Sequence, residues 1–208
     1  MDPSRAALTD LERAAREFTT SIAPLRVGRT CDAADLAAIF RLRGAEIIER
    51  GWASPDTLLA GHDRDEYDDD AVQIAIWESE DVVGTCRLLL PSQQRLLPIE
   101  RAFDLRLAPH GRVVQWSRLV LDRAHRGDPQ HRLAIACFAA LWLETNQRGF
   151  TACAGVIAKP MLDLYRAMGM SFEIVAAPRF VEGELRYPAL SSAATIESAL
   201  RVMRNLVV

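Results

Sequence analysis

The stretch GDPQHRLAIACFAALWLETNQRGF, residues 127–150, decides the fold, because it predicts a long helix that is apolar on nearly every side. Asp128 is suited to the N-cap and Pro129 to the first helical position, and Gly149 follows the predicted end. A helix without a polar face has to be covered all round. We therefore expect it in the core of the protein, packed on a sheet.

Strand-like runs flank this helix on both sides. The runs before it are AVQIAIWE (71–78), DVVGTCRLLLP (81–91) and RVVQWSRLVLD (112–122), and the runs after it are TACAGVIA (151–158), SFEIVAA (171–177) and GELRYPAL (183–190). A short helix, KPMLDLYRAMGM (159–170), closed by Gly169, lies among the later runs. This order predicts a three-layer α/β/α sandwich around a mixed, mostly antiparallel sheet.

The remaining segments predict one domain over residues 1–208. An amphipathic helix is expected within residues 1–22, a short strand in PLRVGRT (24–30), and a second helix from an Asp32 N-cap to about Arg50, before Gly51. Residues 193–206 predict a closing helix. A polar loop at residues 52–71, punctuated by Gly and Pro, is long enough for us to expect a function in it.

Composition narrows the class of protein. Half of the 208 residues are apolar and a quarter are charged, the net charge is -3, and Lys159 is the single lysine. These values predict an ordinary globular protein and argue against a general nucleic-acid binder. The sequence shows no signal-type apolar segment and no membrane-span-length apolar run, so we expect a cytoplasmic protein. The cysteines (Cys31, Cys86, Cys137 and Cys153) lack zinc-site spacing, so we expect them reduced.

The loop contains HDRDEYDDDA, residues 62–71, which packs six carboxylates into eight residues. An EF-hand would need a ligand at its fifth position and glycine at its sixth, where Tyr67 and Asp68 stand. Crowded carboxylates repel one another unless water screens them. We therefore expect Glu66, Asp69 and Asp70 to be solvated.

The order of elements through MLDLYRAMGMSF (161–172) resembles the GCN5-related N-acetyltransferase (GNAT) superfamily. The resemblance implies that Tyr165 is the general acid for the departing thiolate, although Tyr165 also suits simple packing between helix and sheet. The pyrophosphate loop of that superfamily, Q/R-x-x-G-x-G/A, is degraded here. AHRGDPQHRLA (124–134) has one glycine, and an acid and a proline stand where exposed amides would cradle phosphate.

Within this superfamily, residues 43–120 resemble the acyl-homoserine-lactone (autoinducer) synthases and the related long-chain N-acyl amino acid synthases. The matching positions are Arg43, Trp52, Asp63, Asp65 and Asp68 of DRDEYD, Gly84 and Arg87 of GTCRLLLP, and Gln115, Ser117 and Arg118 of QWSRLVL. The first carboxylate of the acidic motif is Asp63, and Gln115 replaces the family's glutamate. RLLPIERAFDL (95–105) is closer to the N-acyl amino acid synthases.

The resemblance implies an N-acyltransferase that moves an acyl group from acyl-carrier protein or acyl-CoA to the amine of an amino acid or S-adenosylmethionine, without a tightly bound cofactor or a metal. Because the pyrophosphate loop is degraded, we expect acyl-carrier protein to be favoured over free CoA as the donor. Amine attack on a thioester needs a base, oxyanion donors and an acid. The candidate catalytic residues are Asp65, Asp68, Glu100 and Tyr165. The candidate substrate-binding residues are Arg43, Trp52, Asp63, Arg87, Gln115, Ser117 and Arg118. Backbone N–H groups of residues 115–120 are the implied oxyanion donors.

Several alternatives stay open. Arg87 and Arg118 suit either the acceptor's carboxylate or ion pairs that steady the acidic motif. Arg123, Arg126 and Arg132 suit docking of an acidic carrier protein or plain solvation, and Phe138, Leu141 and Trp142 suit an acyl pocket or the core. Two other functions compete, namely an ordinary acetyl-CoA-dependent N-acetyltransferase, and a catalytically silent fold that binds an acylated ligand. Gln115 supports the silent fold.

Overall fold

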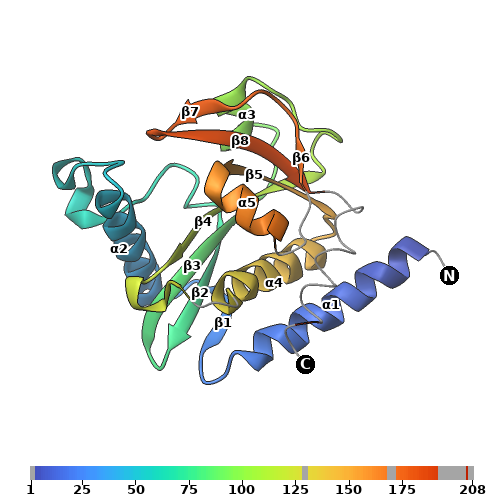
Figure 1. Ribbon diagram of the computed structural model, residues 1–208, viewed down its shortest axis with the longest axis horizontal. Coiled ribbons are helices and arrows are strands. Elements are labelled where there is room, and N and C mark those ends of the chain that lie inside the picture. Colours follow the sequence, from blue (N-terminus) through green and yellow to red (C-terminus); the bar gives the residue numbers. More distant parts are fainter. Residues whose placement is uncertain (1–2, 128–130, 168–171, 192–204, 206–208) are drawn as a thin grey trace.

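The computed structural model describes residues 3–127, 131–167, 172–191 and 205, and its centre is one sheet (Figure 1). The strands are β1 Arg26–Thr30, β2 Val72–Glu78, β3 Asp81–Leu89, β4 Val113–Leu121, β5 Ala152–Ala158, β6 Glu173–Ile174, β7 Arg179–Val181 and β8 Glu184–Ser191. Their order is β1-β2-β3-β4-β5-β8-β6, and β7 pairs with β8. Of the strand pairs in the described residues, β4 with β5 is parallel and the rest are antiparallel. The predicted mixed, mostly antiparallel sheet is confirmed.

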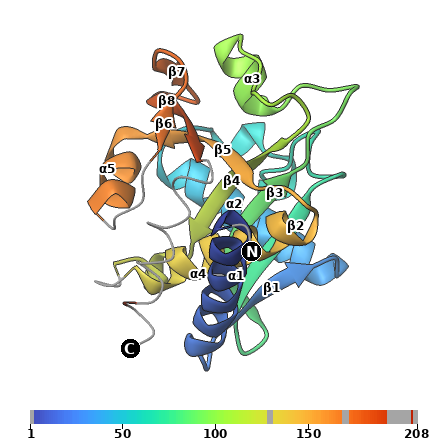
Figure 2. The ribbon, with the colours of Figure 1, turned by 90° about the vertical axis from the view of Figure 1, so that its right-hand side faces the viewer.

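Helices cover both faces of the sheet (Figures 1 and 2). They are α1 Pro3–Ser21, α2 Ala33–Glu49, α3 Pro98–Phe103, α4 Arg132–Gln147 and α5 Lys159–Ala167. Side chains of α1, α4 and α5 share a core with Ile74 and Ile76 of β2, whereas α2 packs on Ala75 and Trp77. Successive strand residues point to opposite faces, so these helices form two separate layers. The predicted three-layer architecture is confirmed.

The helix that decides the fold, α4, is as buried as its sequence predicts. Every side chain from Leu133 to Trp142 is buried. The helix begins at Arg132, and His131 holds the N-cap position in a left-handed conformation. The predicted start at Asp128 and Pro129 lies outside the described residues. In the described part of the chain, no helix is long and apolar enough to cross a membrane.

The loop after α2 folds back on the helix that precedes it. The predicted N-cap is confirmed, because the Asp32 side chain accepts hydrogen bonds from two backbone N–H groups of α2. Two short 3-10 helices, Pro55–Thr57 and Leu59–Gly61, lie in the loop. A Cβ atom at Gly44 would stand 1.9 Å from the backbone oxygen of Gly61, so only glycine lets the loop come this close. The Asp63 N–H then donates to the carbonyl oxygen of Phe40 at 3.0 Å. These contacts hold the acidic stretch against α2.

Two described elements were not predicted from the sequence, α3 and β7. Helix α3 begins with Pro98 at its first position, and the Glu100 side chain accepts a hydrogen bond from the N–H of Leu97, the N-cap residue. Strand β7 has only three residues, too few for a visible alternation. The predicted strand SFEIVAA shrinks to the two residues of β6. The predicted closing helix and the predicted Gly169 helix end lie outside the described residues.

Strand β4 is bulged and diverges from β5. Thr85 of β3 pairs with Val120 and Arg87 pairs with Ser117, so one β3 residue opposes two β4 residues, Arg118 and Leu119. Arg118 takes a φ of +53°, which is uncommon for a residue with a side chain. The parallel pairing with β5 covers only Val113 to Gln115. A bulge bends its strand, and β4 leaves β5 on the side where both strands end.

Candidate active site

A row of three polar side chains crosses the sheet beneath the acidic stretch. Gln73 of β2 pairs in register with Arg87 of β3, and Arg87 pairs with Ser117 of β4. All three point to the face that α2 covers, since the residues on either side of Gln73 and Arg87, and Trp116 before Ser117, pack in the α4 core. Arg43 reaches the same place from α2 and is fully buried. Strand register and one helix therefore bring together residues that lie far apart in the sequence.

Asp68 is the centre of this cluster. Its carboxylate accepts hydrogen bonds from both terminal nitrogens of Arg43, at 2.8 and 3.0 Å, and from Arg87 Nη1 at 2.8 Å. Gln73 Nε2 and the backbone N–H of Asp65 add two more, at 2.9 and 2.8 Å. The Asp68 side chain is 0% exposed. Burial by itself would raise the pKa of Asp68, but the hydrogen bond and charge of Arg43, with Arg87, hold that pKa well below its ordinary value.

Asp63 and Asp65 flank this centre and differ from each other in exposure. Asp63 Oδ2 accepts from Arg43 Nε at 3.0 Å and lies 2.9 Å from Arg118 Nε. Asp65 Oδ1 accepts from Arg87 Nη1 at 2.7 Å and from the Tyr67 N–H at 2.9 Å, whereas Asp65 Oδ2 accepts a longer hydrogen bond, of 3.4 Å, from Arg118 Nη2. The Asp65 side chain is 29% exposed, against 10% for Asp63. Asp65 is thus the carboxylate of the cluster that can reach a ligand.

The other carboxylates of the stretch face outward. Glu66 pairs with Arg101, Asp69 with Arg64 and Asp70 with Arg95, and the carboxylate side chains are 58%, 68% and 81% exposed. The predicted division of the stretch into an inner and an outer set is confirmed in position. Among the described residues no group of three or more His, Cys, Asp or Glu is arranged to hold a metal ion.

Glu100 and Gln115 support α3. The two oxygens of Glu100 accept hydrogen bonds from the N–H groups of Leu97 and Leu107, at 3.0 and 3.1 Å. Gln115 Oε1 accepts from the Ile99 N–H at 3.0 Å, and Gln115 is 2% exposed. Both side chains therefore hold the segment 97–107 on the sheet, and Glu100 is poorly placed to act as a base in this conformation.

Ser117 and Trp52 connect the cluster to its surroundings. The Ser117 hydroxyl accepts a hydrogen bond from Arg87 Nε at 3.1 Å and so helps to orient that guanidinium. The Trp52 ring lies between two arginines, with the guanidinium carbon of Arg50 at 5.0 Å and that of Arg186 at 4.6 Å. Trp52 thus joins the loop after α2 to the β7–β8 hairpin.

Tyr165 lies apart from the carboxylates, in the core that α4 shares with the sheet. Its ring makes an edge-to-face contact with Phe138, at a centroid distance of 5.0 Å, and Phe138 stacks on Trp116 of β4 at 6.0 Å. Burial raises the pKa of Tyr165, so the phenol stays protonated. The row of aromatic rings runs from the start of the β4–β5 divergence to α5. Leu141 and Trp142, predicted with Phe138 to border an acyl pocket, are buried in this same core.

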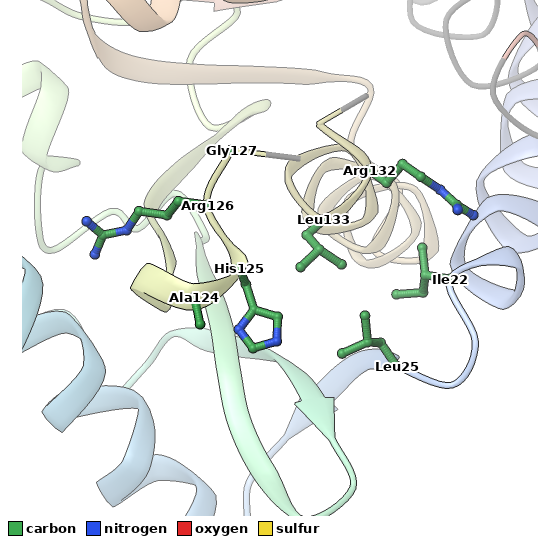
Figure 3. A pocket seen from close by; sticks show the side chains of 8 residues that line it. All are labelled: Ile22, Leu25, Ala124, His125, Arg126, Gly127, Arg132 and Leu133. Atoms are coloured by element: carbon green, nitrogen blue, oxygen red, sulfur yellow. The ribbon is translucent and has the colours of Figure 1, made fainter. Parts of the chain in front are cut away.

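Figure 3 shows a pocket at the start of α4 with a volume of about 320 Å³. Ile22, Leu25, His125 and Leu133 face into it, and the guanidinium groups of Arg126 and Arg132 point away. Arg126 pairs with Glu46 and Glu49, Arg132 donates to the Ser21 carbonyl oxygen, and Arg123 is exposed. Of the three arginines predicted to meet a carrier protein, two are thus bound within the protein.

The sequence did not single out Gln73, Glu182 and Arg186, which contact the cluster or its border. Gln73 was detectable as the polar position in the alternating strand that precedes Arg87. Glu182 Oε1 accepts a hydrogen bond from Arg118 Nη1 at 3.2 Å, and Glu182 lies on the turn between β7 and β8. Sequence spacing gives no sign of that contact, because it joins positions 64 residues apart.

The mixed, mostly antiparallel sheet and the acidic motif paired with Arg43, Arg87 and Arg118 are the features that the resemblance to GNAT-like acyltransferases implied. The parting of β4 from β5 beside this motif is a further observation of the structure. The chain belongs to the family of the N-acyl amino acid synthase FeeM, whose family model matches residues 38–193. It is accordingly an acyltransferase. No curated protein shows a significant sequence match to the chain.

Solved structures agree with this assignment. BjaI, a CoA-dependent acyl-homoserine lactone synthase solved with S-adenosylmethionine and isopentyl-CoA, is 25% identical and has a TM-score of 0.65; the match covers 84% of this chain and 83% of BjaI. LasI, an acyl-homoserine lactone synthase, has a TM-score of 0.69 at 18% identity, over 85% of this chain and 93% of LasI. FeeM from uncultured soil microbes has a TM-score of 0.66 at 14% identity, over 84% and 93%. The last two similarities show the shared fold.

Proposed function

We propose that this chain transfers an acyl group from a thioester, carried by CoA or by acyl-carrier protein, to the amine of an α-amino acid or of S-adenosylmethionine. The observation that carries the proposal is the position of Asp65. Arg87 and the Tyr67 N–H fix one of its oxygens, the other has a single long hydrogen bond from Arg118, and the side chain is 29% exposed, the most of the three inner carboxylates. A carboxylate held in this way is suited to take a proton from an ammonium group.

The reaction proposed for this site forms a C–N bond and breaks a C–S bond. Asp65, directly or through water, takes the proton of the acceptor ammonium, and the neutral amine attacks the thioester carbon. Backbone N–H groups of β4 beyond Gln115, on the edge that is not paired with β5, are the proposed donors to the oxyanion. Tyr165 is the proposed proton donor to the departing thiolate. The second proton, which the attacking nitrogen loses as the amide forms, passes through water to the tyrosinate and restores Tyr165, and Asp65 releases the first proton to solvent. In this scheme Asp63, Asp68, Arg43 and Arg87 position Asp65.

The two possible acyl donors, acyl-CoA and acyl-carrier protein, have unequal support, and acyl-CoA has more. A carrier protein is acidic and needs exposed basic side chains, yet Arg126 and Arg132 bond within the protein. BjaI, which is 25% identical to this chain, is a CoA-dependent acyl-homoserine lactone synthase, and its structure contains isopentyl-CoA. We therefore favour acyl-CoA, with acyl-carrier protein as the alternative. Acyl-CoA and acyl-carrier protein are cytoplasmic acyl donors, so we also propose that the reaction takes place in the cytoplasm.

We infer that residues 1–208 work as one acyltransferase domain. Leu11, Ala14 and Phe18 of α1 are buried in the same core as α4 and the sheet. The N-terminal helix is thus part of the folded unit that presents the site. The 52–71 loop is its proposed active-site loop, since the loop supplies Asp63, Asp65 and Asp68.

One assay separates the candidate functions. The purified protein is incubated with acyl-CoA or acyl-carrier protein of several chain lengths, together with a panel of amino acids or S-adenosylmethionine. Free thiol and methylthioadenosine are followed, and products are identified by mass spectrometry. Thiol release with amino acids would establish N-acyl amino acid synthesis, and methylthioadenosine release would establish lactone formation. Thiol release with acetyl-CoA, and with no longer-chain donor, would indicate an ordinary N-acetyltransferase. No thiol with any donor would overturn the proposal in favour of the silent fold that Gln115 also fits.

A further inference from the structure

Arg186 of β8 presents one edge of its guanidinium group without a hydrogen-bond partner. Among the described residues, neither Nε nor Nη2 of Arg186 has a partner, although the side chain is only 13% exposed. These two nitrogens share one edge of the planar group, and that edge binds a carboxylate through two parallel hydrogen bonds. Burial lowers the pKa of Arg186; the charges of Glu182 and Glu184 oppose this effect, and those of Arg118 and Arg50 add to it. A buried donor edge of this kind needs a ligand to explain it.

The edge stands at the place where β4 and β5 part. Arg186 pairs with Ala158, the last residue of β5, on one side and with Arg179 of β7 on the other. Under the proposed function the thioester carbonyl lies against β4 beyond Gln115, on the side that β5 has left. Arg186 therefore borders the region where the thioester and the acceptor have to meet under the proposed function.

One carboxylate already lies near this edge without satisfying it. Glu182 Oε2 is 3.4 Å from Arg186 Nη2 but makes no hydrogen bond, while Glu182 Oε1 accepts from Arg118 Nη1. Glu182 is 45% exposed and lies on the β7–β8 turn with a φ of +50°. A ligand carboxylate can displace Glu182 from Arg186. The ligand would then accept hydrogen bonds from both Nε and Nη2, which Glu182 does not do.

Arg118 links this edge to the proposed base. Its Nη1 bonds to Glu182 and its Nη2 lies 3.4 Å from Asp65 Oδ2. A ligand beside Arg118 therefore meets a carboxylate on one side and the Arg186 edge on the other. An α-amino acid carries an ammonium and a carboxylate on the same carbon, which matches this pair of opposite charges at short range.

We propose that Arg186, with Arg118, binds the α-carboxylate of the acyl acceptor, so that the acceptor is an α-amino acid or the amino-acid part of S-adenosylmethionine and not a simple amine. This inference rests on the proposed function, because only an acyltransferase has an acyl acceptor whose carboxylate could bind here. The carboxylate preference itself is a binding property and holds or fails on its own.

The test compares two ligands that differ only in the charged group, N-dodecanoylalanine and N-dodecanoylalaninamide, by titration calorimetry on the full chain. Replacing a charge-assisted contact by a neutral one costs about tenfold or more in affinity, so wild type should prefer the carboxylate by that factor. Arg186→Gln should remove the preference, and Arg186→Lys should restore part of it. Arg179→Gln is the matched control, since Arg179 lies on the same hairpin, is 47% exposed and pairs with Asp104.

Each result has a separate meaning. No preference in wild type, including no binding of either ligand, would overturn the carboxylate site, and so would a preference that survives Arg186→Gln. Glu182→Gln should strengthen carboxylate binding, because it removes the competing anion. A carboxylate preference without any acyl transfer would leave the site standing and refute the proposed function. The thermal midpoint of Arg186→Gln should stay close to that of wild type, since the variant removes a buried and incompletely paired charge but also loses the contact of Arg186 with Trp52.

Discussion

The two halves of the acidic stretch have the same chemistry and different surroundings. Asp63, Asp65 and Asp68 face buried or half-buried arginines of α2, β3 and β4. The outer three carboxylates are themselves exposed, and their partners are the exposed Arg64 and Arg101 and the half-buried Arg95. Each half is ion-paired. The difference lies in the arginine partners. Arg43, Arg87 and Arg118 lie on a helix or on strands of the core, which hold their positions. The outer pairs join side chains at the surface. Exposed pairs contribute little to stability, while breaking a buried pair leaves an uncompensated charge.

Asp68→Asn should have the largest effect and tests the buried half of the comparison. The substitution leaves the guanidinium groups of Arg43 and Arg87 without their shared anion, so the free energy of unfolding should fall by about 3–5 kcal/mol. Urea unfolding followed by circular dichroism measures the change. We also expect acyl transfer to be abolished, because the cluster that fixes Asp65 is lost. A loss below about 1 kcal/mol would show that the pairing is no stronger than at the surface.

The pH dependence of stability sharpens the same point. The pKa of Asp68 is lowered in the folded protein from an ordinary value of 3.8, so its ionised form favours the folded state. The stability from Asp68 is therefore present above pH 3.8 and is lost as the pH falls through the folded-state pKa. Wild type and Asp68→Asn should differ most near neutral pH and converge below pH 3.8. Parallel curves down to pH 3 would contradict this.

Asp65→Asn should separate catalysis from stability within the inner half. Asp65 is more exposed than Asp63 and Asp68, and asparagine keeps an oxygen that can accept from Arg87. We expect a fall in acyl transfer of about 100-fold or more, as for a removed general base, with a loss of stability of about 1 kcal/mol. The measurement is thiol release from the preferred donor at saturating acceptor. Asp63→Asn is the matched comparison for a residue of the cluster with no proposed proton transfer, and equal loss at both positions would refute the role of Asp65 as the base.

Tyr67→Phe tests the boundary between the two halves. The Tyr67 hydroxyl donates to the Leu96 carbonyl oxygen at 3.0 Å and accepts from Arg101 Nη1 at 3.2 Å, and its ring is packed under Arg95. Phenylalanine keeps the ring and removes the hydroxyl, so we expect a loss of about 1 kcal/mol in the free energy of unfolding. Acyl transfer should change less than about threefold if the inner half keeps its geometry. A larger fall would show that the segment 95–101 helps to align the inner carboxylates.

Much of this arrangement was predictable because it depends on local patterns. The apolar run of α4, the Asp32 cap and the alternation in β2 each specify an element from neighbouring residues alone. The inner and outer sets of carboxylates were separable because a family-like spacing named Asp63, Asp65 and Asp68. The short elements α3 and β7 were missed, since three to six residues show no period and depend on contacts elsewhere.

The part of the site that could not be predicted comes from tertiary contacts. Glu100 belonged to the predicted base candidates, yet the Leu97 and Leu107 amides occupy both of its oxygens. The row of Gln73, Arg87 and Ser117 depends on strand register, and the Glu182 contact depends on a turn 64 residues after Arg118. A sequence motif identifies the residues of a site. It does not identify the contacts that those residues make with segments far away in the sequence.

Asp70→Asn should have the smallest effect and completes the comparison from the outer side. The Asp70 side chain is 81% exposed, and its contact is a 3.1 Å pair with Arg95, itself half-buried. An exposed pair of this kind is worth less than about 1 kcal/mol, so urea unfolding and thiol release should both stay close to wild type. A higher salt concentration should make the difference in the free energy of unfolding between wild type and Asp70→Asn smaller still, because mobile ions screen exposed charges much more than buried ones. If Asp70→Asn were as damaging as Asp68→Asn, the acidic stretch would act as one electrostatic unit, and burial would not be what distinguishes its two halves.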